Sequence, residues 1–439
     1  MTGPALMPLD PDALFAPLDL TGQQRVLVAI SGGSDSTALL HLFKSFANRR
    51  APALGIVAAT VDHGLRPASA NEAKAVAQLC ADLGIGHVTL RWQGEKPATG
   101  IQAAARLARY RLLDEAARQA GADIVLLGHT ADDQAETIAM RHARGSGDGL
   151  RRGDAGMAPA TLYRDRTWFV RPLLGTSRAV LRDRLRDAGL GWIDDPSNRD
   201  RAYERVRIRE SRPEAPADPA PASRLADSAS AADLISSSIT RPAPGLLRLD
   251  PAMLASDGCL TALRLLLAVC GGTEHLPDEA RAQALLAVLD REKARATLSR
   301  AVIDKRHGSV WLHRESRGLP APAALPADAI WDGRFRAAAP TGNAELIAPV
   351  GNAAAHLAAC VPPGASQALV LAALRAEPGI WRAGSFQRQA APAQLCPVLA
   401  PWRLFLPSFD LAPAAALRRL FSLAGLPSSP WRDHIFRGP

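Results

Sequence analysis

The sequence Ser31-Gly32-Gly33-Ser34-Asp35-Ser36-Thr37 follows an apolar stretch at residues 26–30 that predicts a strand, and it leads into a helical pattern at residues 36–46. Glycines in such a turn let the backbone approach a ligand closely, because no Cβ intervenes. The N–H groups at a helix start and the helix macrodipole favour a bound anion. This order therefore predicts a cradle for phosphate or pyrophosphate. The alternative is an ordinary Ser/Gly turn capped by Ser34 or Asp35.

The loop differs from two familiar nucleotide-binding sequences. No lysine follows its glycines, as a GxxxxGKS/T loop requires, and the GxGxxG spacing of dinucleotide-binding proteins is absent. Further strands are predicted at residues 55–61, 87–92 and 124–127, and helices at 71–83, around 101–116 and from about 131. This alternation predicts an α/β fold, a parallel sheet with helices on both faces that binds ligands at the carboxyl ends of its strands.

Four polar residues have the spacing of one helix face. His129, Asp132, Asp133 and Glu136 fall at positions i, i+3, i+4 and i+7, directly after the strand predicted at residues 124–127. Three carboxylates this close together repel one another unless a cation such as Mg²⁺ or an amine joins them. The alternative is a helix start that favours acidic residues, with Asp132 or Asp133 as its cap.

Other candidate site residues are basic or lie at strand ends. Arg106 and Arg109, three residues apart on a predicted helix, could reach phosphate together. The alternative is that they belong to a solvated or ion-paired helix face. His63 lies beside Asp62 at the end of the second strand. It suits a nucleotide-binding site, and the alternative is a histidine that is simply buried at the end of a strand. Between residues 140 and 213 there are seventeen arginines, no lysine and ten acidic residues, a local excess of positive charge that favours a polyanion such as nucleic acid.

Arg205, Arg207 and Arg209 alternate with aliphatic residues. A strand would place all three on one face, which suits contacts to a phosphate backbone, whereas a helix would spread them. Four prolines at residues 213–222 predict an extended linker. We therefore expect a catalytic domain at residues 1–212, a Pro/Ala-rich linker at 213–230, a mainly helical domain at 231–318 and a small C-terminal domain at 319–439.

Composition restricts the class of protein. The chain has 439 residues, with 47% hydrophobic and 22% charged side chains, and no apolar stretch approaches the roughly 18 residues that span a bilayer. The five cysteines are scattered without a CxxC pair, which argues against a zinc site, an iron–sulfur cluster or a disulfide framework. With no secretory signal at the N-terminus, we expect a cytoplasmic protein.

The glycine-rich loop resembles the SGGxDS loop of the PP-loop ATP-pyrophosphatase superfamily, and further motifs narrow the resemblance. Residues 62–66 (DHGLR), 128–137 (GHTADDQAET), 171–174 (RPLL) and 192–198 (WIDDPSN) occur in an order and spacing similar to those of the tRNA(Ile)-lysidine synthetase family. The match covers residues 25–209. Weaker similarities to the family's motifs follow at Thr297-Leu298, His313-Arg314-Glu315 and residues 331–335 (WDGRF).

The resemblance implies a two-step, ATP-dependent reaction. The C2 oxygen of the wobble cytidine of a CAU-anticodon tRNA(Ile) would attack the α phosphate of ATP, and free lysine would then displace AMP to give lysidine. ATP would lie on Ser31, Gly32, Gly33, Ser34, Asp35 and Ser36, with its adenosine near Ala29, Asp62 and His63. Asp35 or Asp133 would help to hold Mg²⁺.

The resemblance also implies roles for the remaining residues. Asp132, Asp133 and Glu136 would bind the lysine amine or take its proton, and Arg106 and Arg109 would neutralise charge on the phosphates. Contacts to tRNA are expected from Arg144, Arg171, Arg205, Arg207 and Arg209. The enzyme is expected to act as a monomer or a homodimer.

Two departures and two alternatives accompany this interpretation. Val206 stands where family members often carry Asn, and the segment after Leu150 is slightly lengthened. A PP-loop enzyme that thiolates tRNA is one alternative, but such enzymes usually need a CxxC pair or a catalytic cysteine, and the first half of the chain offers only Cys80. A nucleotide- and RNA-binding module without catalysis is the other, and the intact loop and acidic cluster argue against it.

Overall fold

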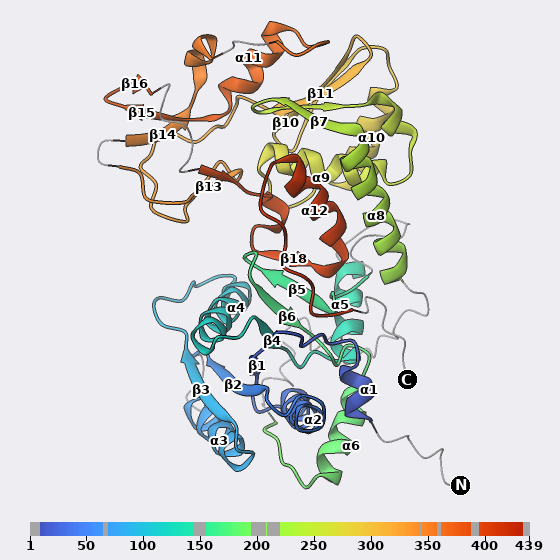
Figure 1. Ribbon diagram of the computed structural model, residues 1–439, viewed down its shortest axis with the longest axis vertical. Coiled ribbons are helices and arrows are strands. Elements are labelled where there is room, and N and C mark those ends of the chain that lie inside the picture. The colour runs from blue at the N-terminus through green and yellow to red at the C-terminus, as the bar shows by residue number, and fades with distance from the viewer. Residues whose placement is uncertain are drawn as a thin grey trace. The chain divides into compact units, whose positions relative to one another are not determined.

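The computed structural model describes residues 9–64, 69–143, 155–194, 208, 220–342, 345–357, 361–387 and 395–432. The chain forms two compact units, whose elements are labelled in Figure 1. Unit 1 comprises Met1–Arg224, Leu406–Phe409 and Pro427–Pro439, and unit 2 comprises Leu225–Phe405 and Asp410–Leu426. Segments near the C-terminus thus contribute to both units, and the expected boundary at residue 319 does not separate compact units.

Unit 1 contains a seven-stranded sheet with the strand order β18-β5-β6-β4-β1-β2-β3. In chain order the strands are β1 (Arg25–Ala29), β2 (Gly55–Asp62), β3 (Gly86–Arg91), β4 (Ile124–Leu126), β5 (Ala160–Tyr163), β6 (Thr167–Val170) and β18 (Phe405–Pro407). The pairings from β3 to β6 are parallel, as predicted. The pairing of β5 with β6 is antiparallel, because a tight turn with positive φ at Arg164 and Asp165 joins them.

Helices surround this sheet. Those of unit 1 among the described residues are α1 (Pro11–Phe15), α2 (Ser34–Arg50), α3 (Ser69–Asp82), α4 (Ile101–Ala120), α5 (Ala131–Ala143) and α6 (Arg178–Asp187). Right-handed crossovers place α2 and α3 on one face and α4 on the other, as Figure 1 shows. The strands are apolar because both faces are covered, and Val26, Leu27 and Val28 of β1 are fully buried.

The strand order positions the candidate site. From β1 the chain winds through α2 to β2 and through α3 to β3, and α4 then returns it to β4 on the other side of β1. The winding direction therefore reverses between β1 and β4. Open α/β sheets bind ligands in the crevice at the carboxyl ends of two such strands. The Ser31–Ser36 loop follows β1 and the His129–Glu136 segment follows β4, so both predicted motifs lie at this crevice.

Unit 2 combines helices with an antiparallel sheet, and this sheet lies within residues 231–318, where a mainly helical segment is expected. Its strand order is β7-β8-β11-β10-β9, from β7 (Ile239–Ala243), β8 (Leu246–Leu249), β9 (Ala294–Leu298), β10 (Ala301–Arg306) and β11 (Ser309–Arg314). Two tight turns with positive φ, at Ser299-Arg300 and His307-Gly308, join β9, β10 and β11. These strands are only five or six residues long and lie between helices, which is why helical periodicity dominated the sequence pattern.

Helices and two small sheets complete unit 2. The larger helices are α8 (Ala220–Ser238), α9 (Cys259–Gly271), α10 (Glu279–Leu289), α11 (Gln367–Arg375) and α12 (Leu411–Leu420), and one small sheet pairs β12 (Ile330–Trp331), β13 (Phe335–Ala337) and β17 (Leu395–Pro397). The other pairs β14 (Glu345–Pro349), β15 (Pro378–Arg382) and β16 (Ser385–Phe386). Helix α8 begins at residue 220, so the expected linker over 213–230 is wrong from there on. A proline in a first helical turn, here Pro221, lacks only an N–H that the helix does not use.

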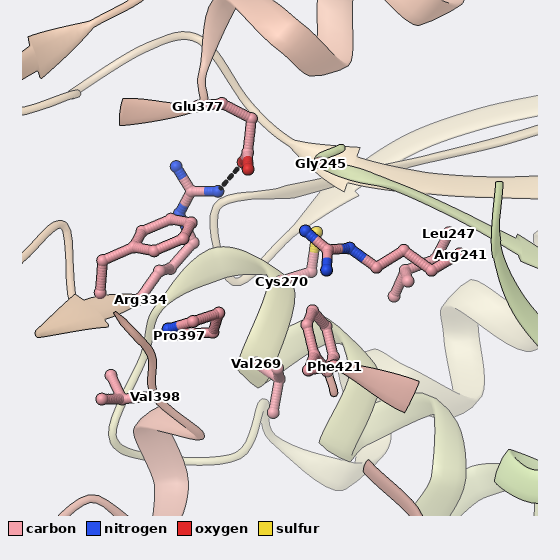
Figure 2. A pocket seen from close by; sticks show the side chains of 11 residues that line it. Arg241, Gly245, Leu247, Val269, Cys270, Arg334, Glu377, Pro397, Val398 and Phe421 are labelled. Atoms are coloured by element: carbon pink, nitrogen blue, oxygen red, sulfur yellow. Dashed lines mark hydrogen bonds and ion pairs between the residues drawn. The ribbon is translucent and has the colours of Figure 1, made fainter. Parts of the chain in front are cut away.

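A buried network of charges lies in unit 2. Asp332 accepts hydrogen bonds from Nε and Nη2 of Arg314, both at 3.0 Å, and from Nε of Arg334 at 2.7 Å. Arg334 also pairs with Glu377 at 2.6 Å, at the edge of a pocket that includes the buried Cys270 (Figure 2). Burial raises the pKa of the Cys270 thiol to about 12. The motifs at residues 313–315 and 331–335, which resemble the family more weakly, thus supply residues that hold unit 2 together.

None of the described helices is both long enough and apolar enough to cross a membrane.

Candidate active site

The glycine-rich loop turns sharply between β1 and α2. Gly32 has φ +85°, and a Cβ added there would lie 2.7 Å from Cδ1 of Ile193 and 2.9 Å from Cγ2 of Val76. Both the backbone conformation and the lack of space therefore require glycine at this position. A Cβ on Gly33 would meet only the Ser31 hydroxyl, at 3.6 Å, so this glycine faces open space. The loop thus has one packed side and one open side.

The start of α2 has no side-chain cap. Gly33 is the N-cap residue and makes no side-chain cap hydrogen bond, whereas Ser34 and Asp35 already belong to the helix. The alternative of a turn capped by Ser34 or Asp35 is therefore wrong. The first N–H groups of this 17-residue helix and its positive dipole end therefore lie at the loop without a side-chain cap. This arrangement suits an anion such as a phosphate.

Serine hydroxyls fix the shape of the loop. The Ser36 hydroxyl accepts a hydrogen bond from the Ser31 backbone N–H at 3.1 Å, donates to the Gly33 carbonyl at 3.2 Å and lies 3.1 Å from the Ser31 hydroxyl. The strand β4 ends directly against this turn, because a Cβ on Gly128 would lie 3.0 Å from the backbone N and Cα of Ser36. Gly128 thereby brings the acidic segment next to the loop.

In the acidic segment, the two carboxylate oxygens of Asp133 have different partners. Its Oδ2 accepts hydrogen bonds from the backbone N–H and the hydroxyl of Thr130, both at 3.0 Å, while its own N–H lies 3.4 Å from that hydroxyl. This reciprocal pair is a capping box at the start of α5. The second carboxylate oxygen, Oδ1, points instead toward Arg178. Glu136 lies one turn further along α5 and is only 2% exposed.

Arg178, which sequence reasoning missed, links carboxylates of the loop and of the acidic segment. Its Nε lies 2.9 Å from Oδ2 of Asp35, its Nη2 lies 3.4 Å from Oδ1 of Asp133, and its backbone N–H donates to Oδ2 of Asp132 at 2.7 Å. Burial alone would lower the pKa of Arg178, but the facing carboxylates, Asp35 first, outweigh burial and raise it. The clustered acids signalled that a cation was needed, but nothing in the local sequence indicated which residue supplies it.

A second group of contacts, also missed, holds the loop from the side. The backbone N–H of Ile193 donates to the carbonyl of Gly32 at 2.8 Å. Arg182, one turn after Arg178 on α6, has its Nε 3.3 Å from the Ser34 hydroxyl and its Nη2 3.4 Å from Asp194. The only sequence signal was the motif at residues 192–198, to which no role had been assigned.

Asp62 and His63 lie at the end of β2. Asp62 is buried and accepts a hydrogen bond from the Gly64 N–H at 2.8 Å. His63 is 3.4 Å from Nη2 of Arg109, and its ring lies edge-on to that of Trp92. Burial, followed by the positive charge of Arg109, lowers the pKa of His63 to about 4. The imidazole is therefore neutral at pH 7 and can exchange hydrogen bonds without carrying charge.

The two predicted arginines on α4 have different partners in the structure. The guanidinium of Arg106 lies 5.2 Å from the ring centre of Tyr110, and its Nη2 lies 3.3 Å from the tyrosine hydroxyl. Arg109 instead contacts His63. Arg106 and Arg109 are both exposed, so either side chain could still move to a bound ligand.

Arg171 is placed differently from the expectation that it contacts tRNA. It is 3% exposed, and its guanidinium donates to the carbonyl of Ala158 at 2.8 Å, the hydroxyl of Thr161 at 3.0 Å and the hydroxyl of Tyr110 at 3.0 Å. Buried in this way, Arg171 cannot reach a phosphate backbone, and its role is structural. Burial raises the pKa of Tyr110, but the charges of Arg171 and Arg106 outweigh burial and lower it. Arg144, Arg205, Arg207 and Arg209 lie outside the described residues.

A mostly parallel sheet whose first strand leads through a Ser-Gly-Gly loop into an uncapped helix defines a PP-loop protein. A family model for the PP-loop domain matches residues 11–214. A tRNA(Ile)-lysidine synthase from Mesorhizobium japonicum is 48% identical to this chain, covering 96% of it and 97% of the relative. Another from Rhizobium meliloti is 40% identical, covering 93% and 94%. The chain belongs to the tRNA(Ile)-lysidine synthase family, and it is an ATP-using, tRNA-modifying enzyme, as the sequence predicted.

A solved structure of a U34-tRNA thiolase from Methanococcus maripaludis is similar over 46% of this chain and 70% of its own, with a TM-score of 0.39 and 15% identity. The thiolation alternative is disfavoured by this chain's own cysteines. Cys80, the only cysteine in residues 1–224, is buried in α3. Burial raises the pKa of its thiol to about 11, so almost no reactive thiolate forms at neutral pH.

Proposed function

We propose that this enzyme joins free lysine to C2 of the wobble cytidine of a CAU-anticodon tRNA(Ile), using ATP and releasing pyrophosphate and AMP. The product, lysidine, would convert an anticodon that reads AUG into one that reads AUA. The observation that carries the proposal is the juxtaposition of an uncapped helix start with an acidic cluster. The open N-terminus of α2 suits a pyrophosphate group. Carboxylates from α5 that suit a cation and an amine lie beside it.

ATP fits the loop by shape and by charge. Its phosphates would lie on Ser31–Ser36, where the open side at Gly33 leaves space and the first N–H groups of α2 face it. The adenosine would lie near Ala29, Asp62 and His63 at the neighbouring strand ends. The neutral imidazole of His63 has an Nδ1 without a hydrogen-bond partner among the described residues, and it could bond the ribose or the base.

Mg²⁺ would be held by Asp35 and Asp133 together with phosphate oxygens. Among the described residues, no cluster of three or more His, Cys, Asp or Glu side chains could hold a metal by itself. Mg²⁺ commonly binds through one or two carboxylates plus substrate phosphates and water, so two carboxylates beside a phosphate cradle fit this ion. When bound, the ion would neutralise charge on the phosphates.

The two chemical steps use neighbouring groups. In the first, the C2 oxygen of cytidine attacks the α phosphorus of ATP, a P–O bond forms and pyrophosphate leaves over the start of α2. In the second, the lysine amine attacks C2, a C–N bond forms and the oxygen leaves with AMP. Asp132, Asp133 and Glu136 would hold the lysine ammonium and take up the proton it loses. Arg106 and Arg109 would neutralise developing charge on the phosphates.

Contacts to tRNA are proposed from the charge pattern. The basic segment that contains Arg144, Arg205, Arg207 and Arg209 would contact the phosphate backbone, which contributes affinity rather than sequence choice. The antiparallel unit 2 would bind another part of the tRNA. We place the enzyme in the cytoplasm, acting as a monomer or a homodimer.

An intermediate-trapping experiment tests the proposed order of steps. Enzyme, a CAU-anticodon tRNA(Ile) transcript and ATP labelled in the α phosphate are combined without lysine, and the RNA is isolated. The transcript should carry the label, and later addition of lysine should release it as labelled AMP. ATP labelled in the γ phosphate serves as a control and should leave the RNA unlabelled. If AMP appears only when lysine is present from the start and no labelled RNA forms, the adenylated intermediate is wrong.

A further inference from the structure

Arg178 occupies the space between the two carboxylates assigned above to Mg²⁺. Its guanidinium contacts Asp35 through Nε at 2.9 Å and Asp133 through Nη2 at 3.4 Å. The side chain of Arg178 is 17% exposed, as is that of Asp35, and that of Asp133 is 13% exposed. These charges are largely removed from water, so each strongly affects the others. One arginine thus neutralises two acids that lie on different helices.

This position conflicts with a metal ion at the same place. Mg²⁺ binds carboxylate oxygens at about 2.0–2.1 Å and demands nearly octahedral geometry. A guanidinium 2.9 Å from Asp35 fills the direction from which such an ion would approach. It also carries a like charge, which would repel the ion. Arg178 must therefore move away from at least one carboxylate before Mg²⁺ can bridge both.

A second partner for Arg178 lies close by. The loop at residues 31–37 contains no basic residue, and the described basic side chains with hydrogen bonds to it or to the first turn of α2 are Arg178 and Arg182 of α6. An arginine forms two parallel hydrogen bonds to a phosphate more readily than a lysine does. A pyrophosphate group on the start of α2 would lie beside Asp35, and hence beside the guanidinium that Asp35 now holds.

We propose that Arg178 is a positioning residue that exchanges partners, holding Asp35 and Asp133 together before substrate binds and moving to the phosphates when Mg²⁺ and nucleotide bind. This inference rests on the proposed function, because it assumes that ATP and Mg²⁺ use this site. Without nucleotide, Arg178 keeps the two acids in place and prevents Mg²⁺ from binding between them. With nucleotide, it adds the cation that the loop lacks.

The exchange predicts a signature that does not depend on turnover. Thermal unfolding of the full-length enzyme is measured with Mg²⁺ alone and with inorganic pyrophosphate, for the wild type and for Arg178→Gln. Mg²⁺ alone should leave the wild-type midpoint unchanged and raise the midpoint of Arg178→Gln, since the two acids are then unpaired. The Kd for inorganic pyrophosphate should rise by about 10- to 100-fold in the variant, as expected for a lost charge-assisted hydrogen bond.

Two further variants make the test decisive. Arg186→Gln removes a more exposed arginine of the same helix, paired with Asp183, and should behave as the wild type in both measurements. Arg178→Lys keeps the charge but cannot span both carboxylates, so Mg²⁺ alone should not stabilise it, and its pyrophosphate affinity should fall less than that of the glutamine variant. If Arg178→Gln does not fold, Arg178→Lys tests the exchange by itself, because it should bind pyrophosphate more weakly than the wild type does.

Unchanged pyrophosphate affinity in both Arg178 variants, with no stabilisation of Arg178→Gln by Mg²⁺ alone, would overturn the exchange. Neither measurement uses tRNA or lysine, so this result is separate from failure of lysidine synthesis. An enzyme that makes lysidine but shows no Arg178 effect contradicts only the exchange. One that shows the Arg178 effect but makes no lysidine contradicts only the proposed function.

Discussion

The backbone N–H of Ile193 donates a hydrogen bond to the carbonyl of Gly32 at 2.8 Å, although the two residues lie far apart in the sequence. The Ile193 side chain also fills the space that any side chain at residue 32 would need. The shape of the phosphate loop is therefore held by a distant segment of the chain as well as by its own glycines.

Replacing Gly32 by Ala should abolish the use of ATP. The new Cβ would lie 2.7 Å from Cδ1 of Ile193 at φ +85°, so the loop must shift away from its position at the start of α2. We expect RNA-dependent pyrophosphate release to fall by at least about 100-fold, in line with the sensitivity of catalysis to misplacement of about 1 Å. Gly86→Ala is the matched control, because a Cβ at Gly86 meets no atom within 4 Å. Near-normal release by Gly32→Ala would contradict the loop assignment.

Replacing Arg171 by Ala should destabilise the fold rather than weaken tRNA binding selectively. The change leaves the buried carbonyl of Ala158 and the buried hydroxyl of Thr161 without the hydrogen bonds that Arg171 donates to them. Buried groups left unsatisfied cost about 1–3 kcal/mol each, so urea unfolding should show a loss of at least about 2 kcal/mol. The exposed Arg106→Ala should change stability little. A stable Arg171→Ala protein with a specific defect in tRNA affinity would restore the original expectation for this residue.

The stability of the enzyme should decrease as pH falls from about 6.5 to 4, partly because of His63. Burial and Arg109 lower the pKa of His63 from 6.5 to about 4. Between these values the unfolded chain binds a proton at this histidine and the folded protein does not, so protonation favours unfolding there. Above pH 6.5 both states are neutral and the effect disappears. Urea unfolding at pH 5 and pH 7 should therefore differ less for His63→Gln than for the wild type. An equal difference would show that His63 does not titrate in this way.

Replacing Asp332 by Asn should destabilise unit 2 strongly. Asp332 is buried and lies between Arg314 and Arg334, so its loss removes the carboxylate that pairs with the buried Arg314 and one of the two that pair with Arg334. Removing one partner of a buried ion pair costs about 3–5 kcal/mol. Asn suits this test because it tolerates the positive φ of 52° at residue 332. The exposed Asp257→Asn is the control, and a loss equal to that of the control would show that the network is not structural.

Sequence reasoning worked best where one local pattern determined the structure. The strand predicted at residues 55–61 is β2 (Gly55–Asp62), and the loop and acidic motifs lie at the strand ends expected from the alternation of strands and helices. Strands such as β1 are buried on both faces, so they appear as continuous apolar runs that are easy to recognise.

Contacts between distant residues could not be predicted in the same way. Arg178 lies 143 residues from Asp35 in the sequence, and nothing in its neighbourhood separates it from the other arginines of α6. Arg171 was expected from the family resemblance to contact tRNA, but it is buried and bonds the hydroxyl of Tyr110, 61 residues away. The sheet of unit 2 was missed because its short strands are joined by turns whose positive φ values fall on residues such as Ser299 and His307 rather than on glycine alone.

The most direct test of the central claim is ATP-dependent incorporation of labelled lysine into an unmodified CAU-anticodon tRNA(Ile) transcript, with Mg²⁺ present. Methionine tRNA, which has the same anticodon, is the control. The account predicts labelling of tRNA(Ile) alone, which would establish lysidine synthesis and place the choice of tRNA outside the anticodon. RNA-dependent pyrophosphate release without labelling would contradict it, because the enzyme would then adenylate RNA for a nucleophile other than lysine.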